Sequence, residues 1–154
     1  MRQFPILMVA VDFSEHATAA LKYAHDLARK LDGTIILVNV FNERDVRAIQ
    51  HVLETYNAAL YQKYIDDGIQ DRQNRLSQLE KEIGTQATVI KKIVRIGVPY
   101  QEILAAIEEE DPDLLVMGTK GRSNLADTVL GSCAQKMYRR CPIPLVSLRP
   151  EPRS

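Results

Sequence analysis

The sequence predicts an α/β protein in which an open sheet of mainly parallel strands is covered by helices on both faces. Short, almost continuously apolar runs alternate with segments that repeat apolar residues every three or four positions. Unbroken apolar runs are typical of strands buried on both faces, and the second spacing is typical of amphipathic helices. The 154 residues contain no internal repeat and no low-complexity linker, so we expect one domain over residues 1–154.

The first β-α-β unit is expected at the start of the chain. Apolar runs from Pro5 to Val11 and from Thr34 to Val40 predict two strands. Helical spacing predicts a helix between them, through Ala17, Ala20, Leu21, Ala24, Leu27, Ala28 and Leu31. Ser14 is a candidate N-cap for this helix, and Gly33 is a candidate stop signal.

The second half of the chain repeats this alternation. In order we expect a strand over 88–96, a helix over 100–109, a strand over 114–117, a helix ending near Arg140 and a strand from Ile143 to Leu148. Gly97-Val98-Pro99 ends the first of these strands. Pro142 and Pro144 cannot donate ladder hydrogen bonds, which places the last strand at an edge of the sheet.

Residues 41–86 are long for a crossover connection. Their apolar residues keep helical spacing, and Asp66-Asp67-Gly68 interrupts the pattern. The interruption leaves two interpretations open, two helices or one bent helix. The tyrosines Tyr56, Tyr61 and Tyr64 either cover the edge of a core or form a surface for a nucleotide or a partner.

The charges are balanced in total but sorted along the chain. Twenty basic and twenty acidic residues give a formal net charge of zero, which argues against a nucleic-acid binder and against a polybasic membrane anchor. Residues 102–113 carry six acids and no base, whereas residues 114–154 carry seven bases and two acids. We expect the acidic run from Glu108 to Asp111 to form a solvated helix end, and we predict no metal site.

Neither a membrane span nor a disulfide framework is predicted. The longest early apolar run, Ile6 to Val11, is too short for a signal-peptide core or a span. The two cysteines, Cys133 and Cys141, have no CxxC spacing and no neighbouring His cluster. The expectation is therefore a cytoplasmic protein with two reduced thiols.

A glycine-rich stretch carries the chemistry. Three of the seven glycines fall within 14 residues where the fourth strand should end: Gly118, Gly121 and Gly131. Glycines there permit positive φ angles and let an anion approach backbone N–H groups, and a helix start beyond them adds partial positive charge. Lys120 and Arg122 supply cations, and Ser132 supplies a hydroxyl donor. The stretch reads as a phosphate cradle, although glycines after a strand also simply make turns; no P-loop or dinucleotide fingerprint is present.

A carboxylate, Asp12, follows the first strand. It is suited to accept a hydrogen bond from a ribose hydroxyl or an adenine amino group, or equally to cap the helix that follows. With a strand order of 3-2-1-4-5, the first and fourth strands are neighbours at a switch point. Asp12 and Gly118 would then face one crevice.

The glycine-rich stretch resembles the ATP-binding branch of the universal stress protein family. Gly118-x2-Gly121-x9-Gly131-Ser132 matches that family's G-2x-G-9x-G-(S/T) signature in spacing and residue type. The Val-Ala-Val-Asp12 opening, the Gly97-Val98-Pro99 turn and the strand that ends at Gly118 are also similar to the family. The resemblance extends over about the whole chain, and residues 41–86 are the most divergent part.

The resemblance implies a five-stranded parallel sheet that holds ATP, ADP or AMP in its crevice, with Mg²⁺ as a possible companion of the phosphates. Ala10 and Asp12 would line the adenosine site, the Val40 backbone would contact adenine, and Met117 and Gly118 would flank the ribose. The phosphates would be surrounded by Lys120, Gly121, Gly131, Ser132 and Cys133, to which we add Arg122 for its charge. The family also implies a homodimer formed through the last strand, Ile143 to Leu148.

Three functions remain open at this point. The first is a nucleotide-binding stress or regulatory protein. The second is a slow ATPase or self-phosphorylating protein, for which Lys120 or Arg122 could stabilise charge but no residue stands out as a base, so no catalytic residue is assigned. The third is a dimeric interaction module with a vestigial nucleotide site.

Overall fold

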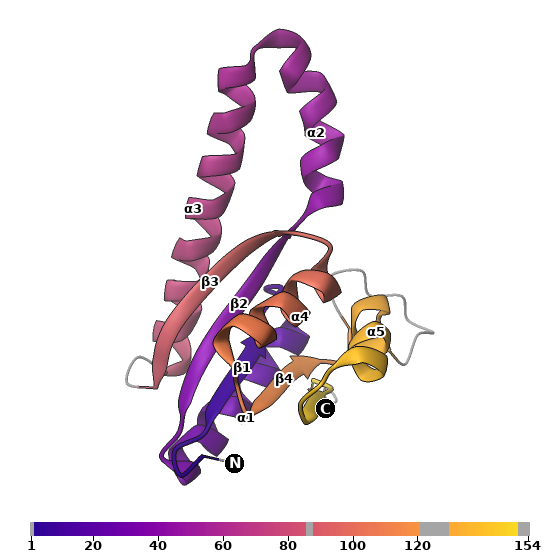
Figure 1. The fold of residues 1–154 in the computed structure, drawn as a ribbon. Helices are drawn as coiled ribbons and strands as arrows, with labels where there is room; N and C mark the ends of the chain where they lie inside the picture. Colours follow the sequence, from indigo (N-terminus) through magenta and orange to yellow (C-terminus); the bar gives the residue numbers. More distant parts are fainter. Residues whose placement is uncertain (1, 86–87, 121–129, 151–154) are drawn as a thin grey trace.

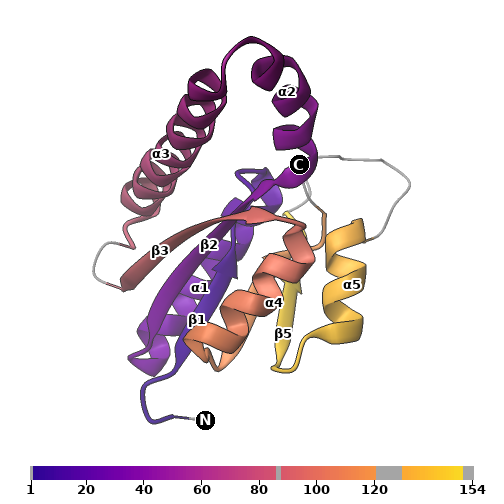
Figure 2. The ribbon, with the colours of Figure 1, turned by 45° about the horizontal axis from the view of Figure 1, so that its top comes forward.

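A computed structural model describes residues 2–85, 88–120 and 130–150. Its centre is a five-stranded sheet in the order β3-β2-β1-β4-β5 (Figure 1, Figure 2). Each pair of neighbouring strands is parallel. The strands are β1 (Ile6–Ala10), β2 (Thr34–Asn42), β3 (Val89–Gly97), β4 (Leu114–Gly118) and β5 (Leu145–Leu148). The predicted fold class and strand order are confirmed, including the edge position of β5.

Helices cover both faces of the sheet, and each face has its own core. On one face α1 (Glu15–Leu31) and the end of α3 (Ala58–Ile83) pack on Leu7, Val9, Leu37 and their neighbours. On the other face α4 (Pro99–Glu110) and α5 (Ser132–Arg140) pack on Met8, Ile36, Leu115 and their neighbours. Because alternate residues of a strand point to opposite faces, the unbroken apolar runs supply both cores.

The two ends of α1 show why this helix forms where it does. Ser14 caps its start, as predicted, because the Ser14 hydroxyl accepts a hydrogen bond from the Ala17 N–H at 3.3 Å. The left-handed residue at its end is Asp32, with φ of 51°, and not the predicted stop Gly33. Gly33 is needed for space, since a Cβ there would lie 2.6 Å from the Pro5 carbonyl oxygen.

Within the long connection, residues 43–83 form a hairpin of two helices that projects from the sheet (Figure 1). The break between α2 (Glu43–Tyr56) and α3 falls at Asn57, and the Asp66-Asp67-Gly68 segment continues as regular helix. Asn57 makes the break because its side chain caps α3, accepting from the Ala59 N–H at 2.9 Å. Gly68 instead faces Phe41: a Cβ there would lie 2.4 Å from the Phe41 ring.

The base of the hairpin has a small core of its own, formed by Phe41, Val46 and Ile65. Tyr61 and Tyr64 pack against it, so these two tyrosines cover a core edge. The Tyr64 ring meets the Phe41 ring edge-on, with 6.0 Å between the ring centroids. Tyr56 differs, because it lies at the tip of the hairpin and is 80% exposed.

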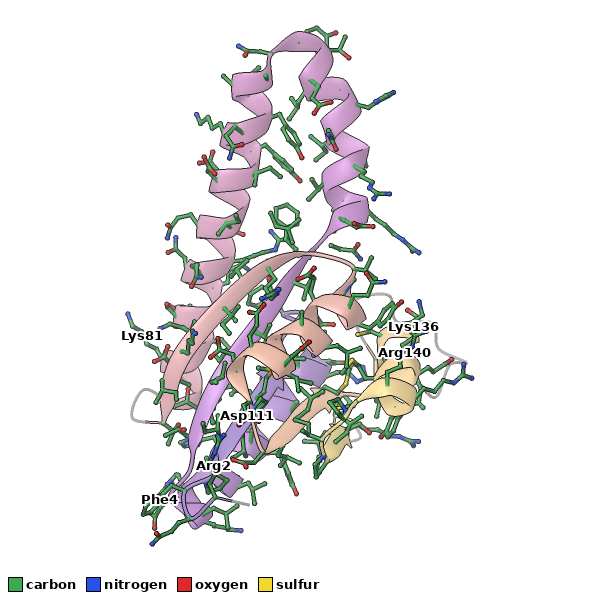
Figure 3. All side chains as sticks on the ribbon, viewed as in Figure 1. Arg2, Phe4, Lys81, Asp111, Lys136 and Arg140 are labelled. Carbon is green, nitrogen blue, oxygen red and sulfur yellow. The ribbon has the colours of Figure 1, made fainter. Side chains whose placement is uncertain are left out.

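The sorted charges near the middle of the chain pair across α4 and β3. Arg95 of β3 donates to Glu102 at 2.7 Å and to Glu109 at 2.8 Å, and these two hydrogen bonds raise the pKa of its guanidinium. Lys91 reaches Glu110 at 2.5 Å, and Asp111 pairs with Arg2 (Figure 3). The acidic run forms a solvated helix end, as expected, since it ends α4 and the side chains of Glu109 and Asp111 are 57% and 82% exposed. Three of its four residues also pair with basic residues of β3 and of the N-terminal segment.

Candidate functional site

A cavity of about 590 Å³ lies at the carboxyl ends of β1, β2 and β4. The starts of α2, α4 and α5 complete its wall. Open α/β sheets bind ligands at this edge, at the point where the connections that leave two neighbouring parallel strands go to opposite sides of the sheet. The lining residues are Ala10, Val11, Asp12, Ala17, Val38, Val40, Asn42, Asp45, Pro99, Ile103, Met117, Gly118, Lys120, Gly131, Ser132, Cys133 and Ala134.

Most residues singled out from the sequence meet in this one cavity. Nine of them line it, although they come from three strands and from the segments on both sides of residues 121–129: Ala10, Asp12, Val40, Met117, Gly118, Lys120, Gly131, Ser132 and Cys133. Gly121 and Arg122 lie outside the described residues. The expected meeting of Asp12 and Gly118 in one crevice follows from the pairing of β1 with β4.

The first turn of α5 forms one end of the cavity. Gly131 is its N-cap, with an extended backbone and no capping side chain. The Gly131 N–H donates to the Thr119 carbonyl at 2.7 Å, and the Thr119 N–H donates to the Leu148 carbonyl at 3.0 Å, so the start of α5 is tied to the ends of β4 and β5. N–H groups in the first turn of a helix lack partners within that helix and carry partial positive charge. With Lys120 they make this the electropositive end.

One of the two reasons expected for the signature glycines, a positive φ, is wrong for the two that the structure describes. Neither Gly118 nor Gly131 adopts a positive φ; the φ of Gly131 is −67°. Gly118 is required by packing, because a Cβ there would lie 2.5 Å from the Cβ of His16 and 3.0 Å from its backbone carbonyl carbon. His16, distant from the glycine-rich stretch in sequence, therefore lies against it in space, and the absent side chain lets α1 approach β4.

Asp12 is fixed in place by the helix cap beside it. Its Oδ1 accepts from the Ser14 N–H at 3.0 Å and from the Ser14 hydroxyl at 2.6 Å. Ser14 in turn caps α1, so Asp12 orients the cap rather than being the cap. Between them Phe13 has a φ of 66°, and the guanidinium of Arg75 stacks 4.1 Å from its ring centroid. Asp12 therefore presents a held carboxylate at the middle of the cavity.

Cys133 lines the cavity as a protonated thiol. Burial and, to a lesser extent, the negative charge of Asp12 together raise its pKa to about 11, while Lys136 acts in the opposite direction. Burial also raises the pKa of Cys141. Both cysteines are free. Because a thiolate is the reactive form, Cys133 is built as a wall of the cavity and not as a nucleophile.

Sequence reasoning missed two polar residues and an apolar wall. Asn42 and Asp45 line the cavity from the start of α2. Pro99 and Ile103 of α4 line it from the opposite side to the sheet. An Asn-x2-Asp spacing directly after the second strand was the available signal, since it marks a helix start at the carboxyl edge of the sheet.

The part of the chain that the structure describes contains neither a metal-binding cluster nor a membrane-spanning helix. Across residues 2–85, 88–120 and 130–150, no three His, Cys, Asp or Glu side chains gather where they could hold a metal ion. Over the same ranges no helix has the length and apolarity to cross a membrane.

The fold and the cavity define a doubly wound α/β protein with a pocket at its switch point. A model of the universal stress protein family matches residues 3–149. The chain belongs to the universal stress protein family.

Curated relatives match nearly end to end. Universal stress protein MJ0577 of Methanocaldococcus jannaschii is 24% identical over 155 residues, which cover 93% of each chain. Universal stress protein YxiE of Bacillus subtilis is 28% identical over 150 residues, which cover 93% of this chain and 99% of the relative. The match therefore includes residues 41–86 and the cavity.

Solved structures share the fold. The structure of MJ0577 superposes with a TM-score of 0.79 at 22% identity and covers 96% of both chains. A universal stress protein in complex with cAMP gives a TM-score of 0.65 at 18% identity, covering 97% of this chain and 100% of that one. A universal stress protein from Archaeoglobus fulgidus in complex with dAMP gives 0.59 at 19% identity, covering 95% and 98%.

Proposed function

We propose that this chain is a stress-response protein that binds an adenine nucleotide, ATP in the first instance, in the cavity at the carboxyl ends of β1, β2 and β4. The observation that carries the proposal is the order of chemistry across the cavity. Hydrogen-bonding side chains Asn42 and Asp45 adjoin the end of β2, the held carboxylate of Asp12 follows β1, and Lys120 with the start of α5 follows β4.

That order matches the parts of a nucleotide. A base would lie over β2 between Val40 and Ile103, a ribose would meet Asp12, and the phosphates would meet Lys120 and the N–H groups of α5. The volume of about 590 Å³ is within the range of small-molecule pockets. Universal stress proteins of the same fold in complex with cAMP and with dAMP support an adenine nucleotide as the ligand.

Mg²⁺ would arrive with the nucleotide rather than occupy a protein cage. The described cavity wall offers two carboxylates, Asp12 and Asp45, and no cluster of three metal-ligating side chains. Mg²⁺ typically keeps several waters and takes phosphate oxygens beside one or two carboxylates. A cation at the phosphate end would therefore be held mainly by the phosphates and by water.

Binding is favoured over turnover. Hydrolysis needs a base or an orienting group near the terminal phosphate. At the β4 and α5 end the described lining residues are Met117, Gly118, Lys120, Gly131, Ser132, Cys133 and Ala134. None of these is a carboxylate or a histidine, and the thiol of Cys133 is protonated.

The test is to identify the nucleotide carried by gently purified protein and to measure ATP binding by calorimetry. We expect heat-denatured protein to release ATP, ADP or AMP, and millimolar ATP to raise Tm. Lys120→Met should weaken ATP binding about tenfold and leave adenosine binding unchanged, because the phosphates are the part of the nucleotide that the Lys120 charge would meet. Lys81→Met, at the far end of α3 (Figure 3), is the matched control. No released nucleotide and no thermal shift would refute the proposal.

We also propose a homodimer through Ile143 to Leu148. β5 has β4 on one side and is an edge of the sheet. The carbonyls of Pro144 and Leu148 accept from the N–H groups of Leu115 in β4 and of Thr119, the residue after β4. Since backbone groups alternate along a strand, Leu145 and Ser147 direct theirs to the open edge. Ser147→Pro should give monomers in light scattering while Ser147→Ala stays dimeric; a dimeric Ser147→Pro variant would exclude this interface.

A further inference from the structure

We propose that Asn42 and Asp45, at the start of α2, read the 6-position of the purine base and make the site prefer a 6-amino purine over a 6-oxo purine. The inference rests on the proposed nucleotide site, because it needs a base at the β2 end of the cavity. It assigns a specificity role to the one pair of polar side chains that the α2–α3 hairpin contributes to the described cavity wall.

The side-chain amide of Asn42 is oriented by a helix cap, and its N–H donors make no hydrogen bond among the described residues. Asn42 is the last residue of β2 and the N-cap of α2, and its Oδ1 accepts from the Arg44 N–H at 3.0 Å. This hydrogen bond fixes the side-chain amide with its oxygen committed to the helix. The Nδ2 group, which has two N–H donors, is the part of Asn42 left for a ligand in the cavity.

Asp45 supplies the matching acceptor. It is three residues after the N-cap, a position from which an acidic side chain often bonds back to the cap, yet among the described residues it makes no hydrogen bond and no ion pair. Glu43, in the same turn, does pair, reaching Arg47 at 3.4 Å. Asp45 lines the cavity, whereas Glu43 does not. A general preference for acids at helix starts therefore explains Glu43 and leaves the placement of Asp45 unexplained.

A donor beside an acceptor is the complement of one edge of adenine. Adenine offers N–H donors at its 6-amino group and an acceptor at the adjacent ring nitrogen N1, whereas a 6-oxo purine offers an acceptor at position 6 and an N–H donor at N1, so the order of donor and acceptor along the edge is reversed. With the phosphates fixed at the Lys120 end, the base reaches the β2 end of the cavity in one direction. The Asp45 carboxylate would accept from a 6-amino group and would repel a 6-oxo group, because two acceptors would then face each other.

The experiment compares ATP with ITP, which differ in this edge of the base. Affinities are measured by calorimetry for the full chain and for Asp45→Asn, Asp45→Ala and Glu43→Gln. The wild-type protein should bind ATP about tenfold tighter than ITP, since a partly exposed hydrogen bond gives modest discrimination. Asp45→Asn replaces an obligate acceptor by an amide that also donates, so it should reduce the ATP-to-ITP ratio about fivefold or more.

The controls distinguish a failure of this inference from a failure of the proposed nucleotide site. Glu43→Gln removes the same charge from the same helical turn and should keep the wild-type ratio. Asp45→Ala should weaken ATP and leave ITP unchanged or tighter, and circular dichroism should show both Asp45 variants folded, since Asp45 is exposed. If ATP binds but the ratio is the same in all four proteins, the inference is wrong and the nucleotide site stands. If the wild-type protein binds neither nucleotide, both proposals fail.

Discussion

The sheet and the α2–α3 hairpin differ in how many of their side chains are buried. In the sheet, Met8, Val9, Leu37, Leu115 and Val116 are completely buried, and each strand is packed on both faces. In the hairpin, α2 buries one side chain over 14 residues, Val46. Interior packing therefore holds the sheet, whereas the hairpin is positioned by contacts at its base and projects as an exposed pair of helices (Figure 1).

The base of the hairpin is where the two regions meet, and the cavity lies there. Arg72 stacks 3.7 Å from the centroid of the Phe41 ring, and Arg75 stacks on Phe13, the residue after Asp12. The start of α2 supplies Asn42 and Asp45 to the cavity wall. A rigid sheet thus sets most of the wall, and a weakly packed hairpin supplies the polar residues at one end of it.

Truncating an apolar side chain should separate the two regions most strongly. Leu37→Ala leaves a cavity in a fully buried core and should lower the free energy of unfolding by about 2–5 kcal/mol. Leu60→Ala removes a side chain that is 47% exposed in the hairpin and should change it by less than about 0.5 kcal/mol. Urea titrations followed by circular dichroism measure both. Equal losses would mean that the hairpin is part of the main cooperative core.

Replacing glycine by alanine should destabilise the sheet more than the hairpin, because the added methyl group meets backbone in one region and a side chain in the other. Gly118→Ala would drive a Cβ into the backbone of His16, so α1 must shift, and we expect a loss of about 1–3 kcal/mol. Gly68→Ala meets the ring of Phe41, which is a side chain and not backbone, and gains helix propensity of about 0.5–1 kcal/mol, so its net change should stay within about 1 kcal/mol. Thermal unfolding of both variants checks this. A Gly118→Ala variant as stable as the wild type would show that α1 packs less closely on β4.

The sequence predicted the sheet well because the evidence for it was local. Four of the five strands were apolar runs and β3 was rich in β-branched residues, and each lay next to a Gly, Pro or Asp signal. The hairpin was left open because its apolar residues keep helical spacing on both sides of Asn57. The cap that divides the helices is a single hydrogen bond to Ala59, whereas the stronger turn signal, Asp66-Asp67-Gly68, is absorbed into α3.

The same contrast holds for the cavity. Residues at the ends of strands, such as Ala10 and Val40, could be placed from sequence because parallel strands bring their carboxyl ends together. Asp45 was missed: the Asn42-x2-Asp45 spacing marks a helix start at this edge, but the angle at which α2 leaves β2 is what brings Asp45 to the wall. The packing role of Gly118 could not be predicted either: its contact with His16 joins residues about a hundred positions apart, which no local pattern reveals.

Removing an N-cap should lower the global free energy of unfolding when the helix packs on the sheet, but should cause only local opening when the helix belongs to the hairpin. Ser14→Ala removes the cap of α1, and the Asp12 carboxylate loses its hydroxyl partner, so the global free energy of unfolding should fall by about 1–2 kcal/mol. Asn57→Ala removes an equivalent cap from the exposed end of α3. It should speed hydrogen exchange in the first turns of α3 while the global value changes by less than about 0.5 kcal/mol. Equal global losses from the two variants would contradict an independently opening hairpin.

The smallest effect concerns a thiol, and it tests how closed the cavity wall is. The pKa of Cys133 is raised to about 11, so at pH 8 roughly one thiol in a thousand is ionised. Alkylation by iodoacetamide should therefore be slow at pH 8 and should rise about tenfold per pH unit toward pH 10. A Val52→Cys variant places a reference thiol on the hairpin at a position that is 57% exposed, and it should react at least a hundredfold faster at pH 8.

Asp12→Asn should lower the Cys133 pKa and speed its reaction, because the carboxylate opposes ionisation. Peptide mass spectrometry distinguishes the sites. Equal rates at residues 52 and 133 would mean that the wall opens as readily as the hairpin surface, and the division between a rigid sheet and a loose hairpin would not extend to the cavity.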